Sequence, residues 1–96
     1  TPLDIAKTEE YIAVIYQEQG HLSKALEMFK SVVETKKKAY NDDDMAYDMA
    51  ATYNNMAVVY QKLGNEQRAR EMGTKAHNIF LKTLGPDHPF TKQTSR

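Results

Sequence analysis

The sequence contains no cysteine and only four glycines and three prolines among its 96 residues. Without cysteine the chain has no disulfide framework, no thiolate ligand for a metal and no cysteine nucleophile, which favours a reducing compartment. Its apolar runs are only a few residues long, so we expect neither a membrane-spanning helix nor a secretory signal. These absences together predict a soluble, cytoplasmic protein.

The sequence also lacks a charge excess of either sign, because 13 basic residues balance 13 acidic ones. A chain without a net field does not attract polyanions, so neither nucleic acid nor a membrane surface is expected as a partner. A length of 96 residues with 41% hydrophobic content fits one small domain, residues 1–96. The chain has no initiator methionine and its last residues begin a pattern that is not completed, so we expect a fragment of a longer protein.

Sparse glycine and proline favour an all-α fold, and apolar residues do recur at helical intervals. The pattern predicts helices over about 3–19, 22–39, 44–63 and 66–83. The expected packing positions are Ile5, Ala6, Ile12, Ala13 and Tyr16 in the first helix; Leu22, Ala25, Leu26, Phe29, Val32 and Val33 in the second; Met45, Met49, Tyr53, Met56, Tyr60 and Leu63 in the third; and Ala69, Met72, Ala76, Ile79 and Phe80 in the fourth.

The second pair of predicted helices repeats the first. Ala13, Tyr16, Gly20 and Ala25 recur 44 positions later as Ala57, Tyr60, Gly64 and Ala69. Small residues allow helices to approach closely, tyrosines fill the space between them, and glycines permit a tight turn. We therefore predict one repeat over 3–40, a second over 44–84, and the truncated start of a third over 87–96.

A charged stretch, KKKAYNDDD, joins the two predicted repeats at residues 36–44. Lysines at the end of one helix and aspartates at the start of the next both complement the helix dipoles. The stretch does not match a calcium-binding loop, in which acidic residues alternate and are followed by glycine. We therefore interpret it as the end of one helix and the start of the next, and predict no metal site.

No catalytic constellation emerges from the remaining residues. No two of His21, His77 and His88 are spaced to share a helix face, which argues against zinc. His77 is expected to be a surface residue beside Ala76, and His88 to bond locally where a new helix starts. Single glycines do not make a phosphate-binding loop. We predict no catalytic residues, no cofactor and no enzymatic activity.

The recurring small residues, tyrosines and glycines resemble the motif of the tetratricopeptide repeat, a helix-turn-helix unit. They are Ala13, Tyr16, Gly20 and Ala25 in the first repeat and Ala57, Tyr60, Gly64 and Ala69 in the second. More narrowly, TYNNMAVVYQKLG (52–64) and LGPDHPFTK (84–92) are similar to the longer repeats, of 42–44 residues, in kinesin light chains and related scaffolds. The sequence departs from the pattern at Gly73, which stands where Phe29 stands in the first repeat. A glycine within a helix predicts either a close helix crossing or a large neighbour that fills the gap.

The resemblance implies a right-handed α-solenoid whose concave groove is lined by the first helix of each repeat. The side chains that it places in this groove, and that we predict to bind a peptide, are Lys7, Glu10, Tyr11, Val14, Gln17, Asn54, Asn55, Val58, Gln61 and Lys62. Asn55 is the first candidate, because this position commonly holds peptide main chain in such repeats. Recognition of a free C-terminal carboxylate is disfavoured, because Val14 and Val58 replace an asparagine that it needs.

The resemblance therefore implies an adaptor or scaffold that binds a segment of a partner protein. The alternative is a structural spacer or a self-associating repeat fragment with no peptide ligand of its own. The reason for this alternative is the outer face around Met72, Ile79 and Phe80. We expect this face to lack a covering helix, and a homo-oligomer through it is then possible. A third hypothesis, an enzyme completed by other parts of the parent protein, has no support from any residue here.

Overall fold

The computed structural model describes residues 1–41 and 47–94, and within these ranges it contains five α-helices and no strand. The helices are α1 (Pro2–Glu18), α2 (Leu22–Ala39), α3 (Tyr47–Lys62), α4 (Glu66–Leu84) and α5 (Pro89–Thr94). The prediction of an all-α fold is confirmed. The predicted start of the third helix at residue 44, together with Met45 and the three aspartates 42–44, lies outside the described residues.

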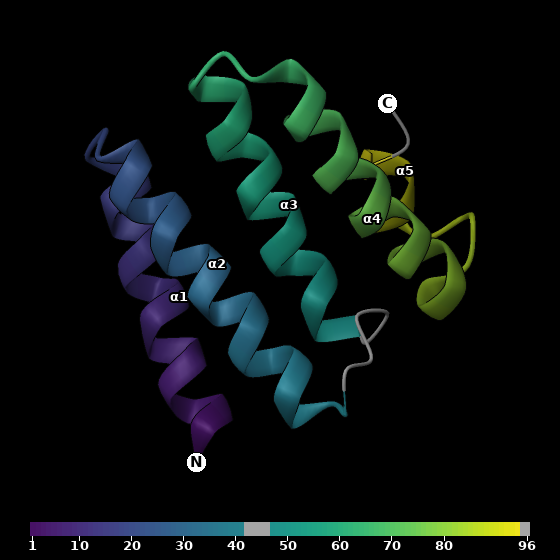
Figure 1. Cartoon of the computed structure of the whole chain (residues 1–96). Helices are drawn as coiled ribbons and strands as arrows, with labels where there is room; N and C mark the ends of the chain where they lie inside the picture. The colour runs from purple at the N-terminus through teal and green to yellow at the C-terminus, as the bar shows by residue number, and fades with distance from the viewer. Residues whose placement is uncertain (42–46, 95–96) are drawn as a thin grey trace.

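Two antiparallel helical hairpins lie side by side, and a short fifth helix covers part of the second (Figure 1). Within the hairpins α1 packs on α2 and α3 packs on α4, while α2 against α3 forms most of the contact between them. α5 packs on α4. The first helices of the two hairpins, α1 and α3, also touch, which places them at one common surface.

The turn within each hairpin has the same hydrogen-bonded structure. After α1, the amide of His21 donates to the carbonyl of Tyr16 at 2.8 Å, and after α3 the amide of Asn65 donates to that of Tyr60 at 2.9 Å. Each turn requires a residue at positive φ, which Gly20 and Gly64 supply with φ of 84° and 82°. The recurring Tyr and Gly of the sequence repeat thus end the first helix of each hairpin in the same way.

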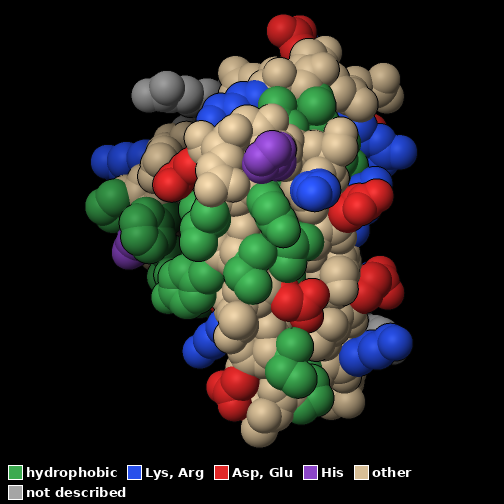
Figure 2. All heavy atoms as spheres, turned by 90° about the vertical axis from the view of Figure 1, so that its left-hand side faces the viewer, with side chains coloured by type: hydrophobic (Ala, Val, Ile, Leu, Met, Phe, Trp, Pro, Cys, Tyr) green, Lys and Arg blue, Asp and Glu red, His purple; other side chains and the backbone are tan. Residues whose placement is uncertain are grey.

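One core runs through both hairpins and contains the recurring alanines together with larger residues from all four long helices. The methionines predicted to pack, Met49, Met56 and Met72, are buried. The predicted packing face of α1 is wrong in part, because Ile5 and Ile12 are 61% and 39% exposed. Figure 2 views the molecule from the α1 side and shows hydrophobic side chains along this face. The residues 44 positions later, Met49 and Met56, are by contrast buried in the core.

Two further expectations about α4 are corrected. Met72, Ile79 and Phe80 do not form an open apolar face, since all three are buried, and the Phe80 ring lies 5.7 Å from that of Phe90 on α5. At Gly73 neither a close crossing nor a large neighbour is found, because a Cβ atom there would meet nothing within 4 Å. The side chain missing at Gly73 leaves a hollow instead.

Candidate functional site

A groove runs between α1 and α3 at the surface that these two helices share. It encloses about 350 Å³. Its lining residues, which define the α1–α3 groove below, are Lys7, Glu10, Tyr11, Val14, Asp48, Ala51 and Asn55. Five of the ten residues predicted to bind a peptide therefore lie together here.

A second, smaller hollow of about 190 Å³ lies beside the first, between α3 and α5. We call it the α3–α5 groove, and its lining residues are Tyr47, Ala51, Asn54, Asn55, Phe80, Phe90, Gln93 and Thr94. The Phe80 ring lies edge-on to Tyr47, with ring centroids 5.9 Å apart, so the floor of this groove is aromatic. Ala51 and Asn55 line both grooves and connect them across α3.

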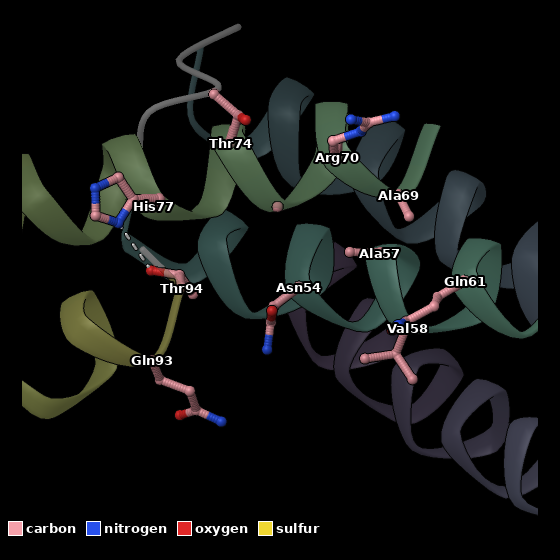
Figure 3. A pocket seen from close by; sticks show the side chains of 11 residues that line it. Asn54, Ala57, Val58, Gln61, Ala69, Arg70, Thr74, His77, Gln93 and Thr94 are labelled. Atoms are coloured by element: carbon pink, nitrogen blue, oxygen red, sulfur yellow. Dashed lines mark hydrogen bonds between the residues drawn. The ribbon is translucent and has the colours of Figure 1, made fainter. Parts of the chain in front are cut away.

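The predicted groove residues on the other side of α3 lie elsewhere. Asn54, Val58 and Gln61 line a hollow of about 530 Å³ between α3 and α4, which Gly73 opens and which Figure 3 shows with Gln93 and Thr94 of α5 at one end. Gln17 and Lys62 line none of these three hollows. The structure thus divides the predicted set over two sides of α3, with only Asn54 reaching both the α3–α5 groove and this hollow.

Beneath the α1–α3 groove lies the first lysine of the charged stretch that joins the two repeats. Lys36, in the last turn of α2, is fully buried. Its ammonium group lies 3.0 Å from Glu10 Oε1, 2.9 Å from Thr52 Oγ1, and 3.2 Å from both Oδ1 and the main-chain oxygen of Asp48. Lys36 lies in the last turn of α2, as the interpretation of the lysine run as a helix end predicted, but its burial and its carboxylate partners were not predicted.

The partners of Lys36 are bonded to one another and to a tyrosine. The hydroxyl of Thr52 donates to Glu10 Oε2 at 2.6 Å, and the hydroxyl of Tyr40 donates to Asp48 Oδ2 at 3.0 Å. We call Glu10, Lys36, Tyr40, Asp48 and Thr52 the Lys36 network. Burial, followed by the hydrogen bond to Asp48 and the charge of its carboxylate, raises the pKa of Tyr40 above its ordinary value.

Glu10, which we predicted as a ligand contact, also has partners within the protein. Both of its carboxylate oxygens, and both of those of Asp48, already accept hydrogen bonds within the protein. These two carboxylates oppose two ammonium groups, that of buried Lys36 and that of Lys7 at the rim. The formal charges in and under the groove therefore cancel, so the groove does not select a strongly charged ligand.

A signal for Lys36 was present in the sequence. The packing stripe of the second helix, which reaches Val32 and Val33, continues at the next helical step to position 36. The residue 44 positions later is Phe80, which is buried. A lysine on a packing stripe, aligned with a phenylalanine in the other repeat, indicates a buried ammonium that needs carboxylate partners.

Two of the three histidines, His77 and His88, have hydrogen-bond partners in α5. His88 Nδ1 accepts a hydrogen bond from the amide of Phe90 at 3.1 Å, as predicted for a residue that starts a helix. His77 is half-buried and is not the simple surface residue we expected, since its Nδ1 lies 3.1 Å from the carbonyl oxygen of Thr91 and 3.2 Å from Thr94 Oγ1 (Figure 3).

Within residues 1–41 and 47–94 no group of three acidic or histidine side chains is arranged to hold a metal ion. The same described residues include no helix that is long and apolar enough to cross a membrane.

Comparison with known proteins places these two hairpins in a family. Two family models, both described as tetratricopeptide repeat, match residues 10–44 and residues 48–96, the latter just over half of the chain. The chain belongs to the tetratricopeptide repeat family. Such repeats generally mediate protein–protein interactions, and proteins built from them are typically non-enzymatic scaffolds.

A solved structure titled "Crystal structure of BtubC (BKLC) from P. vanneervenii" is similar to this tetratricopeptide chain, with a TM-score of 0.86. The match covers 98% of this chain but only 36% of that one, at 20% sequence identity. At this identity the likeness is one of fold. Among curated proteins none matches this chain in sequence.

Proposed function

We propose that this tetratricopeptide segment binds an extended segment of a partner protein across α3, in the α1–α3 groove and the adjoining α3–α5 groove. The single observation that carries the proposal is the place of Asn55, a half-buried asparagine that lines both grooves. A peptide that passes from one groove to the other has to cross it.

The chemistry of the surface suits main-chain recognition. An asparagine amide can donate to a peptide carbonyl and accept from a peptide amide at the same time. Val14 and Ala51 offer small apolar walls, and Tyr11, which is 75% exposed, offers an aromatic surface beside them. Since the charges of the α1–α3 groove cancel, affinity would come from hydrogen bonds to main chain and from a few apolar contacts.

The experiment uses 12-residue peptides selected from a random phage-displayed library for binding to this chain. Asn55→Ala is expected to weaken their binding by about 1–2 kcal/mol, roughly tenfold in Kd, because two hydrogen bonds to the peptide are lost. The matched control is Asn78→Ala, which removes the same group from an exposed position on α4. Equal affinities of Asn55→Ala and the unaltered chain, measured by calorimetry, would contradict the proposal.

A second candidate function, self-association without a peptide ligand, is favoured by one feature of α1. Ile5, Ile12 and Ile15 are 61%, 39% and 51% exposed, which is unusual for isoleucine. A chain that uses this face would form dimers or larger species as its concentration rises, and light scattering separates the two candidates. A monomer at the highest attainable concentration would leave peptide binding as the function.

The remaining expectations from the sequence form part of the same proposal. They are a partner that is a protein and not nucleic acid or membrane, the absence of a cofactor, and a cytoplasmic location. The balance of charge, 13 basic against 13 acidic residues, supports the first of them.

A further inference from the structure

The contact between the two repeats contains a charged group at a position that an apolar side chain could fill. Lys36 belongs to α2, while its partners Glu10 and Asp48 belong to α1 and α3, so one ammonium group joins both repeats. The equivalent residue of the second repeat is Phe80, which is buried against the rings of Tyr47 and Phe90. An aromatic side chain is thus sufficient to fill this position.

A buried ammonium group is a poor means of adding stability. Removing it from water is costly, and a well-packed apolar residue in its place is often as stable or more stable. What an ion network adds over apolar contacts is direction, because each hydrogen bond keeps its strength only within a narrow range of distance and angle. The hydrogen bonds of Lys36 therefore restrain the distances and angles between its partners, which the apolar contacts of Phe80 do not.

We propose that Lys36 is a positioning residue for peptide binding: it fixes the separation and register of α1 and α3, and so the shape of the α1–α3 groove. The inference rests on the proposed function of that groove. Lys36 does not touch the peptide, because its side chain is only 1% exposed. It acts through Glu10 and Asp48, which form the groove wall, and through Thr52, one turn from Asn55 on α3.

The first test measures helix separation without any peptide. Since the chain has no cysteine of its own, spin labels can be attached at Glu18→Cys and Lys62→Cys, exposed positions at the ends of α1 and α3. Pulsed electron resonance then gives the distribution of distances between the labels. Lys36→Met and the milder Thr52→Val should broaden this distribution, whereas Lys38→Met, the same change at an exposed lysine of α2, should leave it unchanged.

The second test measures affinity for the library-selected 12-residue peptides, with circular dichroism to show that each variant is folded. We expect Lys36→Met to raise Kd about tenfold, within the usual range for coupling through a protein, and Thr52→Val to raise it less. Lys38→Met should bind as the unaltered chain does. If Lys36→Met does not fold, Thr52→Val decides both tests.

The outcomes separate this inference from the proposed function. Unchanged distances and unchanged affinity in Lys36→Met, or in Thr52→Val where only that variant folds, would overturn the positioning role while Asn55→Ala still weakened binding. A broadened distribution without loss of affinity would also overturn it, because the groove would then not depend on helix separation. Peptide binding that is insensitive to Asn55→Ala would instead contradict the proposed function itself.

Discussion

Single polar side chains determine much of the character of the candidate site. Lys36 has three N–H groups and four oxygen atoms within 3.2 Å, which leaves no unmet hydrogen-bonding need at a fully buried position. Tyr40 extends the same network toward the end of α2 by donating to Asp48. The network is therefore satisfied as a unit, and removing one member affects the others.

Tyr40 makes the network sensitive to high pH. The folded state raises the pKa of Tyr40 above its ordinary value of 10.0, so the folded chain holds this proton more tightly than the unfolded chain does. Its contribution to the free energy of unfolding is complete below pH 10 and is lost as the pH rises through the folded pKa. We expect Tyr40→Phe to lower the free energy of unfolding by about 0.5–1.5 kcal/mol at pH 8, with the difference shrinking above pH 10.

Urea unfolding of the unaltered chain and of Tyr40→Phe at pH 8 and at higher pH measures this difference. Tyr47→Phe, at a 48% exposed position, is the control. Its difference from the unaltered chain in the free energy of unfolding should not shrink above pH 10. A difference between Tyr40→Phe and the unaltered chain that stays constant from pH 8 to pH 11 would show that the hydroxyl of Tyr40 is not held by Asp48.

The individual helices follow from the sequence more directly than the site does. Periodicity and sparse glycine predicted 22–39 for the second helix, which is observed at Leu22–Ala39, and 66–83 for the fourth, observed at Glu66–Leu84. Which face of α1 is buried was not predictable from its own pattern. Ile5 and Ile12 have the spacing of a packing face, but burial also requires a neighbouring helix, and the neighbours depend on how the hairpins stack.

Two glycines in the second repeat should respond in opposite directions to the same substitution. Gly64→Ala places a Cβ at φ of 82° in the turn after α3, which should lower the free energy of unfolding by about 1–2 kcal/mol. Gly73→Ala lies within α4, where a Cβ meets nothing within 4 Å, and should raise it by up to about 1 kcal/mol. Urea unfolding of both variants measures the pair, and effects of the same sign would contradict the geometry of one of the two positions.

At the scale of the whole molecule, the stacking of two hairpins decides which predicted residues share a site. The resemblance to tetratricopeptide repeats indicated the first helices, and the structure brings Lys7, Tyr11, Val14 and Asn55 to one groove between them. The one-turn spacing of Asn54, Val58 and Gln61 along α3 turns those side chains toward α4 and α5. This division depends on the rotation of α3 about its axis. The packing of α3 against both α4 and α2 sets that rotation, so the sequence of α3 alone does not predict it.

The central claim is that partner peptides bind across α3 between α1 and α5. The most direct measurement is a titration of the ¹⁵N-labelled chain with a library-selected peptide, followed by amide chemical shifts. We predict that the largest amide shifts fall at the four groove residues of α1, at residues 47–55 and near Phe90, while the outer surface of α2 and the exposed isoleucines of α1 stay unchanged. The four groove residues of α1 are Lys7, Glu10, Tyr11 and Val14. Shifts concentrated on Ile5, Ile12 and Ile15, or along α2, with none around Asn55, would contradict the claim.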